Sequence, residues 1–456
     1  MSNLKVKKKR TVVTKKSDDK AVLNVIKTKN KNINKKNSFI RFIDLFAGMG
    51  GTRLGFENAC RELNLKYKCV FTSEIKEHAI SSYIKNFNNS KISGDITKIK
   101  SSTIPNFDFL LAGFPCQPFS SAGKRNGFLD ERGGLFFTIH RILKEKKPSG
   151  FLLENVDGLV SHNKGKTLKT ILSKLESLDY RVSWKILDAS DFGVPQKRKR
   201  IYIVGHRKKT VNLNNFSITK NTISEHIEKN KPFKHTEFTK TLSQKFSLDE
   251  LAGKSIKDKR GGKNNIHSWD LELKGKVSKK QKVLLDLILR KRRNKKWAEK
   301  KGIEWMDGMP LTLSEIKTFY KENNLKKDLD SLVKKGYLKL EHPKQKIVVN
   351  GISKRVPYYE SPKGYNIVSG KLSFPIVKIL HNNEISPTLV ATEAGKIGVV
   401  TKKGVRAISV REGLRFSGFP EDYSLEGIGY KKAFDLIGNT VMPPVIKAVS
   451  LRLLRK

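Results

Sequence analysis

A cysteine stands in this sequence at a position where chemistry is possible. Cys116 ends an apolar, strand-like run and is flanked by Pro115 and Pro118, so the pattern places it outside regular structure. Open α/β sheets bind ligands at the carboxyl ends of their strands, and a thiolate at such an end is a candidate nucleophile. Cys60 and Cys69 instead fall in helix-like and strand-like patterns, which is typical of small core residues.

Charged side chains follow two further apolar runs. Glu154 lies in FLLENV, where a carboxylate is costly to bury unless it has a partner or a task. Gln196, Arg198 and Arg200 alternate along QKRKR, and a period of two places them on one face at the start of a strand. Such a face would suit a flipped base or phosphates. A solvated basic strand end is the alternative interpretation.

The elements that must position these side chains begin with a strand, a glycine loop and a helix. The run at 39–46 is strand-like, AGMGG follows at 47–51, and the next residues read as a helix. This order opens a doubly wound α/β sheet. The next strand-like run reaches Glu74, about where such folds bind ribose hydroxyls, and Asp95 follows a further helix. The pattern predicts a nucleoside cofactor site, although glycines that only shape a tight turn would look the same.

The charge of the chain predicts a polyanionic partner. There are 93 Lys and Arg against 43 Asp and Glu in 456 residues, which gives a formal net charge of +50. Each phosphate contact made by Lys or Arg releases counterions, although a lysine-rich proteome would account for part of this excess. Residues 1–38 carry 13 Lys and Arg against 2 acidic residues without hydrophobic periodicity, and are interpreted as a flexible basic arm.

Composition also argues against several classes of protein. The chain of 456 residues is long enough for two or three structural units. Its 37% of hydrophobic residues is enough to build hydrophobic cores in them. No apolar run approaches the length of a membrane span and no secretory signal is visible, so a cytoplasmic protein without membrane contact is expected. Three cysteines cannot form a disulfide scaffold and fit a reducing compartment. No Cys/His cluster has zinc spacing, so no metal is expected.

Taken together, the motifs resemble those of the cytosine-C5 DNA methyltransferases, in that family's order and spacing. Within the family, the layout is similar to that of bacterial restriction-modification methylases. The resemblance covers 39–205 and about 385–456. The matching motifs are DLFAGMGG (44–51), GFPCQPFS (113–120), ENV (154–156), QKRKR (196–200), RAISVREGLRFSGFP (406–420) and GNTVMPP (438–444).

The resemblance implies a fold and an activity. It implies a Rossmann-like, S-adenosylmethionine-dependent catalytic domain made of 39–205 plus 385–456, with a mainly helical or mixed target-recognition domain, 206–384, inserted in it. The expected enzyme is a site-specific DNA (cytosine-5-)-methyltransferase that acts on duplex DNA as a monomer. A cognate restriction endonuclease for the same site is possible. The alternatives are an RNA cytosine-C5 methyltransferase and a noncatalytic DNA-binding protein that kept the fold.

The resemblance also implies roles for individual residues. Cys116 would add to C6 of a cytosine flipped out of the duplex, Glu154 would donate a proton at N3, and Arg198 and Arg200 would hold O2 and a nearby phosphate. C5 then attacks the methyl group of S-adenosylmethionine. The expected cofactor contacts are Phe46, Gly48, Gly50, Gly51, Glu74, Ile75, Asp95, Ile96, Pro115, Leu135 and Asn439. The expected DNA contacts are Gln117, Ser120, Gln196, Arg290, Arg292 and Arg293.

Two segments of the expected recognition domain read as helical. Residues 278–301 begin with a serine cap and end in a basic cluster that contains Arg290, Arg292 and Arg293. Residues 313–341 read as helix, loop, helix, glycine and strand, an order that resembles a winged helix-turn-helix and could place a helix in the major groove. A helical subdomain with solvated basic faces is the favoured interpretation.

Overall fold

The sheet at the centre of the computed structural model is mixed and six-stranded. The model describes residues 39–88, 91–115, 134–232, 235–259, 261–262, 264–305, 307–349, 352–368 and 374–455. The strand order is β2-β1-β3-β4-β6-β5, and only β6 runs against its neighbours. The strands are β1 (Ile40–Leu45), β2 (Tyr67–Ser73), β3 (Phe109–Gly113), β4 (Gly150–Val156), β5 (Arg181–Asp188) and β6 (Lys199–His206).

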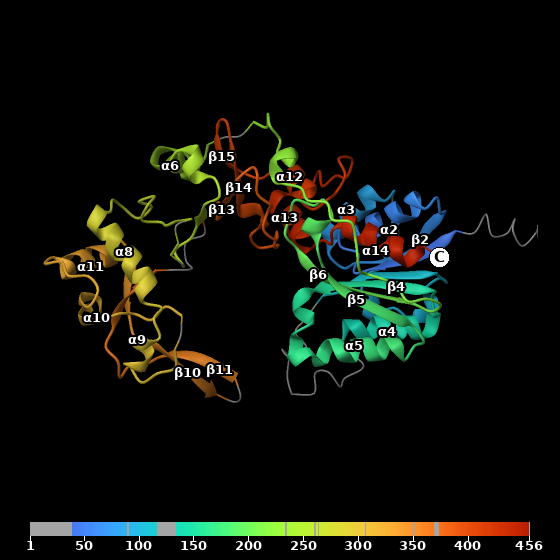
Figure 1. The fold of residues 1–456 in the computed structure, drawn as a ribbon, viewed down its shortest axis with the longest axis horizontal. Helices are drawn as coiled ribbons and strands as arrows, with labels where there is room; N and C mark the ends of the chain where they lie inside the picture. Colours follow the sequence, from blue (N-terminus) through green and yellow to red (C-terminus); the bar gives the residue numbers. More distant parts are fainter. Residues whose placement is uncertain are drawn as a thin grey trace, which may run out of the picture.

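Helices cover both faces of this sheet (Figure 1). Parallel strands covered in this way have no solvent face, and β4 is accordingly buried from Gly150 to Asn155. One core contains Phe56 of α2 and Val445 of α14, and the opposite core contains Ile139 of α4 and Ile171 of α5. The helices of this lobe are α2 (Gly51–Glu62), α3 (Glu77–Asn86), α4 (Leu135–Lys146), α5 (Lys166–Glu176), α12 (Val410–Arg415), α13 (Tyr430–Asn439) and α14 (Pro443–Leu454).

The last helix packs against the first helix of the sheet. A Cβ atom added to Gly55 of α2 would lie 2.5 Å from Ile446 Cβ of α14, so glycine is required for this approach. Pro443 and Pro444 lie in the first turn of α14, where proline costs no hydrogen bond. The two ends of the described chain therefore share one core around the sheet, and the predicted α/β fold class is confirmed.

The segment before α12 is fixed by a buried ion pair. The Arg406 guanidinium donates to both carboxylate oxygens of Glu412, at 2.7 and 2.6 Å. Glu412 also accepts from the Ser409 backbone N–H at 2.7 Å, and Ser409 caps α12 in return. A reciprocal cap of this kind satisfies donors at the helix start. The motif at 406–420 thus has a structural role in this fold.

A second, five-stranded sheet has the order β15-β14-β13-β7-β8. Its strands come from both sides of the predicted boundary between residues 384 and 385. Strand β13 pairs with β14 on one side and with β7 on the other, so it joins residues 397–407 to residues 255–266 in one sheet. In Figure 1 this sheet and α6 lie between two larger lobes. The elements here are α6 (Glu237–Lys245), α7 (Leu248–Leu251), β7 (Ser255–Ile256), β8 (Asn265–Ile266), β13 (Lys378–Leu380), β14 (Ile397–Thr401) and β15 (Gly404–Ala407).

The second lobe, here called the helical lobe, has its own core. Leu284, Leu329 and Ile367 belong to one buried cluster there. The helix expected at 278–301 is two helices separated by a turn. The helical lobe consists of α8 (Lys279–Lys291), α9 (Lys296–Glu299), α10 (Leu313–Lys317), α11 (Leu325–Lys334), β9 (Leu338–Glu341), β10 (Lys344–Val349), β11 (Ile352–Pro357) and β12 (Gly364–Ile367).

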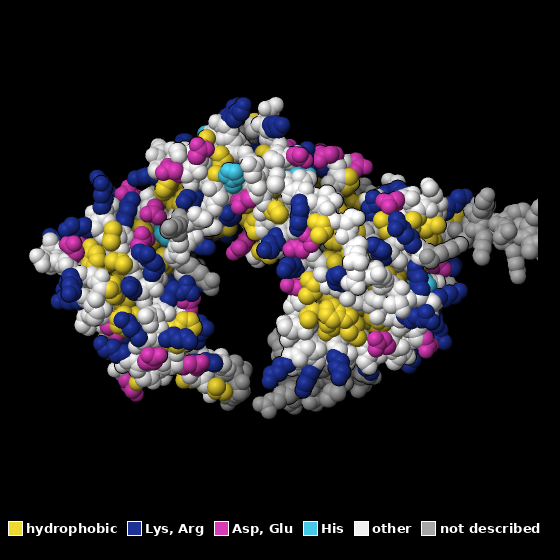
Figure 2. All heavy atoms as spheres, viewed as in Figure 1, with side chains coloured by type: hydrophobic (Ala, Val, Ile, Leu, Met, Phe, Trp, Pro, Cys, Tyr) yellow, Lys and Arg dark blue, Asp and Glu magenta, His cyan; other side chains and the backbone are white. Residues whose placement is uncertain are grey.

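An opening separates the helical lobe from the lobe of the six-stranded sheet, and Figure 2 shows it as a gap through the molecule. Lys and Arg side chains border the opening on both lobes, with acidic side chains among them. Within the described ranges, the helices are all too short or too polar to cross a membrane.

Candidate active site

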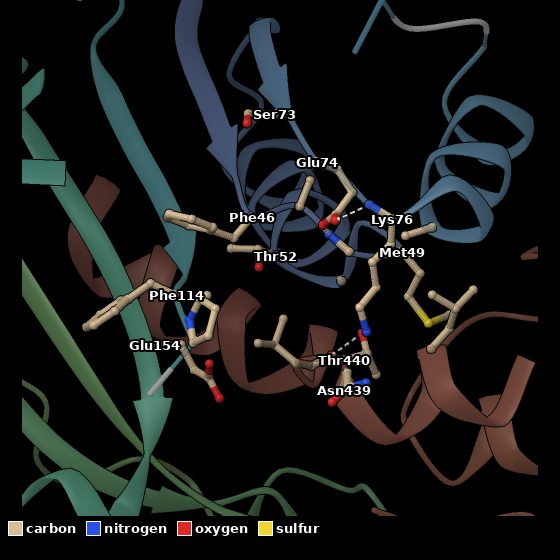
Figure 3. Close-up of a pocket in the computed structure, with 18 of the residues that line it drawn as sticks. Phe46, Met49, Thr52, Ser73, Glu74, Lys76, Phe114, Glu154, Asn439 and Thr440 are labelled. Atoms are coloured by element: carbon tan, nitrogen blue, oxygen red, sulfur yellow. Dashed lines mark hydrogen bonds between the residues drawn. The ribbon is translucent and has the colours of Figure 1, made fainter. Parts of the chain in front are cut away.

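A cavity of about 710 Å³ lies at the carboxyl ends of β1 to β4. Such a volume is typical of a site for a small molecule, and this edge of the sheet is where open α/β folds bind ligands. Figure 3 shows Glu74 and Glu154 at separate parts of the cavity, with Thr440 and Asn439 beside it. The predicted residues that line it are Phe46, Gly48, Gly51, Glu74, Ile75, Asp95, Ile96, Pro115, Leu135, Glu154, Arg198, Arg200 and Asn439.

The glycine loop forms one wall of this cavity, and its glycines differ in role. Gly48 has φ +54°, a conformation that glycine adopts without strain, and a Cβ atom there would meet nothing within 4 Å. Gly50 does not line the cavity. It has φ +82°, and a Cβ atom there would lie 2.2 Å from Phe87 Cε2. We expected a cofactor contact at Gly50, but the structure gives it a packing role against Phe87.

Glu74 holds the glycine loop to the end of β2. Its carboxylate accepts backbone hydrogen bonds from Gly48 at 2.7 Å, Ile75 at 2.8 Å and Lys76 at 2.9 Å (Figure 3). The neighbouring Ile75 side chain is 67% exposed although it is large and apolar, and it lines the cavity. A carboxylate beside an open apolar surface suits a ligand with both hydroxyl groups and a ring.

Asp95 and Asn439 line the cavity from other elements. Asp95 Oδ1 accepts from the Thr97 hydroxyl at 2.7 Å and the Thr97 backbone at 2.9 Å, and these bonds lower the pKa of Asp95. Asn439 donates to the Asp435 carboxylate at 3.0 Å. Asp435 also bonds Lys76 at 3.2 Å, so α13 is tied to the chain that follows β2. Both polar groups are thus held in place at the rim.

Glu154 and Arg200 form an ion pair on the other side of the cavity. Arg200 Nε lies 3.2 Å from Glu154 Oε1, and Glu154 is 7% exposed. Burial raises the pKa of Glu154, while the charges of Arg200 and Arg198 oppose that rise. Because the net shift is upward, this carboxyl holds a proton at higher pH than an exposed glutamate does. That is the property required of a proton donor at a base nitrogen.

Arg198 lines the same cavity, but its two terminal nitrogens donate within the protein, and its Nε has no partner among the described residues. Its guanidinium donates to the backbone carbonyls of Leu389 at 3.1 Å, Gly438 at 3.1 Å and Thr440 at 2.8 Å. Burial lowers the pKa of Arg198 to about 10. A direct hold on a substrate phosphate does not fit this geometry. Arg198 instead holds the segments at Leu389 and at 438–440 next to Arg200.

Gln196 and Arg292 do not fit as DNA contacts either. Gln196 has no exposed surface, donates to the Phe416 carbonyl at 2.9 Å and accepts from Leu389 N–H at 3.1 Å. Arg292 is 5% exposed and donates to the Asn366 side chain. Both expectations came from residue type and spacing, which do not show burial. Gln196 and Arg292 are corrected here to structural residues.

The remaining predicted positions are accessible or lie outside the described ranges. Arg290 is exposed, and Arg293 pairs with Asp307 at 2.7 Å. Cys116, Gln117 and Ser120 lie outside the described residues. The strand end that precedes them is fixed, since Asn155 Nδ2 donates to the Phe114 carbonyl at 3.1 Å.

Sequence reasoning missed Lys76 and Thr440, which line the cavity, and Asp435, which bonds Lys76. Lys76 and Asp435 are 359 positions apart in the chain, and neither lies in a motif that predicts chemistry. Thr440 and Asn155 lie inside GNT and ENV, so their motif membership was a usable signal. Asn155 was passed over because its neighbour Glu154 was the candidate proton donor.

We predict that Glu74→Ala weakens cofactor binding by about tenfold or more, because a charged acceptor that orders the loop is removed. Binding of duplex DNA is expected to change far less. Isothermal titration with cofactor and with DNA measures both, and Glu77→Ala, an exposed acid on α3, is the matched control. A variant that loses DNA affinity and keeps cofactor affinity would move the cofactor site elsewhere.

Asp44, at the end of β1, predicts a pH-dependent stability. It is fully buried, accepts the Tyr83 hydroxyl at 3.1 Å, and burial raises its pKa to about 8 while Arg53 opposes the rise. Between its ordinary pKa and this value, the folded state keeps a proton that the unfolded state has lost. The stability contributed by protonated Asp44 therefore falls as pH rises towards about 8.

Asp44→Asn should remove this dependence. The melting temperature of the variant minus that of wild type is expected to increase from mildly acidic buffer up to about pH 8, because only wild type must take up a proton on folding. Differential scanning calorimetry across that range measures the difference. A difference that is independent of pH would contradict the raised pKa of Asp44.

The sheet order is that of a Rossmann-like α/β fold, and the cavity lies at the edge where such folds bind ligands. The chain belongs to the C-5 cytosine-specific DNA methylases, whose family model matches residues 40–455. The predicted activity, DNA (cytosine-5-)-methyltransferase, is thereby confirmed, and the family implies dependence on S-adenosylmethionine.

Curated relatives match over most of the chain. Type II methyltransferase M.NlaIV of Neisseria lactamica is 55% identical over 422 residues, which cover 91% of this chain and 99% of the relative. Type II methyltransferase M.BanI of Aneurinibacillus aneurinilyticus is 40% identical over 90% of this chain and 94% of its own. Among solved structures, a DNMT2 mutant of Spodoptera frugiperda shares the fold, with a TM-score of 0.50 and 16% identity over 92% of this chain and 100% of that one.

Proposed function

We propose that the protein is the modification enzyme of a type II restriction–modification system. It methylates C5 of one cytosine within a specific duplex site, with S-adenosylmethionine as methyl donor. The observation that carries this proposal is a single cavity that joins the Glu74 carboxylate and glycine loop to the buried Glu154–Arg200 pair. Full-length similarity to named type II methyltransferases supports the biological setting.

The residues of the cavity fit S-adenosylmethionine, which supplies an electrophilic methyl group when bound. Glu74 would accept hydrogen bonds from ribose hydroxyls. The exposed face of Ile75 offers an apolar surface for the adenine ring, and ionised Asp95 would accept from its amine. Phe46 and the Gly48–Gly51 turn would lie against the methionine part. Leu135, Pro115 and Asn439 complete the wall of the cavity.

The chain's own residues would then act on the flipped cytosine. The Cys116 thiolate adds to C6 and forms a carbon–sulfur bond. Glu154 holds a proton at N3, which draws electron density away from the ring and eases that addition. Arg200 keeps the Glu154 carboxyl oriented towards the base. After methyl transfer, loss of the C5 proton and of Cys116 restores the aromatic ring and the free enzyme.

The proposed division of labour follows the predicted domains. Residues 39–205 plus 385–456 bind the cofactor and perform catalysis, and 206–384 recognise the target sequence. The five-stranded sheet crosses the 384/385 boundary, so residues 397–407 contribute to the base of the recognition domain. We further propose that the enzyme acts as a monomer on DNA in the cytoplasm and that an endonuclease cleaves the same site when it is unmethylated.

Bisulfite sequencing of DNA from a methylation-free host that expresses the protein tests this function. We expect complete protection of one cytosine within one short motif, and no protection in DNA from a host with an empty vector. Folded, cofactor-binding protein that protects no cytosine would contradict the proposal. Extracted RNA sequenced in the same way tests the RNA alternative.

A further inference from the structure

We propose that the hairpin of β10 and β11, residues 344–357, enters a groove of the duplex and is a principal DNA contact of the helical lobe. This inference deepens the proposed function and rests on it, because it names the element that contacts the DNA.

The hairpin is not part of any core. None of its described residues belongs to the buried cluster of the helical lobe, and it forms a separate two-stranded sheet. A lone two-stranded ribbon is only marginally stable in water. Val348 near its tip is 70% exposed. In Figure 1 the hairpin extends from the helical lobe towards the opening between the two lobes. A ribbon held this far from any core is available to a partner.

The charges of the hairpin oppose its own folding. The pairing register places Lys346 directly opposite Arg355, on the same face as Lys344. Like charges directly opposite each other on paired strands are destabilising. The hairpin contains no acidic residue. Among the described residues, its one ion pair is a 3.5 Å contact between Lys346 and exposed Glu304. A polyanion against this face would turn the repulsion into attraction.

The base of the hairpin is rigid enough to present this face. The Tyr358 backbone N–H donates to the Pro343 carbonyl at 2.7 Å, and His342 Nδ1 lies 2.9 Å from the Ser361 carbonyl. A two-stranded antiparallel ribbon has dimensions that fit the major groove. Its backbone direction is therefore set before DNA binds, which lowers the entropy that binding must offset.

The surrounding fold identifies the hairpin as a wing. Helices α10 and α11 are followed by β9, which pairs antiparallel with β12, and Leu311 bridges to Tyr365 of β12. This is the arrangement of a winged helix-turn-helix, which the sequence order resembled. In that arrangement the hairpin between β9 and β12 is the wing, and α11 is the helix that usually enters the groove.

The charges on α11 make it the weaker candidate for the groove. Asp330 accepts from Lys326 at 2.6 Å and from the Tyr365 hydroxyl at 3.0 Å. Asp328 accepts from Gln281 at 2.9 Å. These two carboxylates offset two of the three lysines of α11, whereas the hairpin carries Lys344, Lys346, Lys354 and Arg355 with no acidic residue. We therefore assign the DNA contact to the wing and not to the helix.

The test compares two double variants that remove the same charge. Lys346→Thr with Arg355→Thr removes the facing cations of the hairpin, and threonine pairs favour a strand. Lys326→Ala with Lys327→Ala removes two exposed cations of α11. Binding to a duplex that carries the methylated motif found by bisulfite sequencing, and to the same duplex with the motif scrambled, is measured over a range of salt concentrations.

We expect the hairpin variant to bind both duplexes at least about tenfold more weakly. Affinity should also fall less steeply with salt, with the magnitude of the slope of log affinity against log salt smaller by about 2. Its melting temperature should be equal to or above that of wild type, because the repulsion is removed. The α11 variant should bind as wild type does. Loss of affinity together with a lower melting temperature would mean a structural role and would overturn the proposal.

Two further results would also overturn it. One is wild-type affinity in the hairpin variant. The other is an α11 variant that loses as much affinity as the hairpin variant, which would assign the contact to the helix. Wild-type protein that methylates no DNA is a different result, because it removes the proposed function itself. Cofactor titration of both variants checks that the sheet lobe is intact.

Discussion

Cys116→Ala is expected to lower methyl transfer by about 10⁴-fold or more, since loss of a nucleophile removes the step on which the others depend. Burial raises the pKa of Cys60 to about 12 and that of Cys69 to about 11, so both are thiols at neutral pH. Of the three cysteines, only Cys116 is left as a candidate thiolate. Transfer of a labelled methyl group to duplex DNA measures the loss.

The control for this prediction is Cys69→Ala. It makes the same truncation at a half-buried thiol of β2, and methyl transfer should remain near the wild-type rate. Cofactor affinity should stay nearly unchanged in Cys116→Ala, which separates lost chemistry from lost folding. A Cys116→Ala enzyme as active as wild type would refute covalent catalysis by this residue.

A covalent adduct provides a second, direct measurement. A duplex that carries fluorine in place of hydrogen at C5 of the target cytosine cannot release a proton there, so the bond between Cys116 and C6 should persist after methyl transfer. Mass spectrometry is expected to find protein joined to DNA for wild type and for Cys69→Ala, but not for Cys116→Ala. An adduct at another residue would relocate the nucleophile.

The fold was predictable from sequence because its signals are local. The sequence has a series of apolar runs, and a glycine loop follows the first of them. This pattern predicted parallel strands, and β1 to β4 are parallel to one another. Glu74 and Glu154 were found for the same reason, since Glu74 directly follows β2 and Glu154 lies near the end of buried β4. The carboxyl edge of the sheet then brings both to one cavity.

The burial of individual side chains could not be predicted in this way. The partners of Gln196 and Arg198 are about 190 to 240 positions away in the chain, so no local pattern reveals them. The period of two correctly placed Arg198 and Arg200 at one cavity. It did not show that Gln196 precedes β6 and turns into the protein. Whether an arginine binds a ligand or a backbone carbonyl depends on distant segments.

The helical lobe shows the same limit at the level of elements. Helices α8, α10 and α11 were anticipated from serine, glycine and apolar spacing. The hairpin was missed, although Asn350-Gly351 between two strand-like runs is a usable hairpin signal. Its cross-strand register, Lys346 opposite Arg355, exists only once both strands are paired. The functional hypothesis for the hairpin therefore required the structure.

Glu154→Gln is expected to lower kcat/KM for DNA methylation by about 10²- to 10⁴-fold, the usual contribution of a positioned proton donor. Glutamine keeps the size of the side chain and can donate a hydrogen bond, but it has no proton to transfer to N3. Asp157→Asn makes the same change of charge at an exposed carboxyl three residues later and should be nearly neutral. A Glu154→Gln enzyme with wild-type activity would rule out proton donation by this residue.

The pH profile distinguishes this role from a merely structural one. The proposed mechanism requires the thiolate of Cys116 and the protonated form of Glu154, so kcat/KM should rise and then fall with increasing pH. The falling limb arises because Glu154 loses its proton as pH passes its raised pKa. Glu154→Gln should keep the rising limb and lose the falling one. If the variant instead kept both limbs at reduced height, Glu154 would only hold Arg200 in place, and the proton at N3 would have to come from another group.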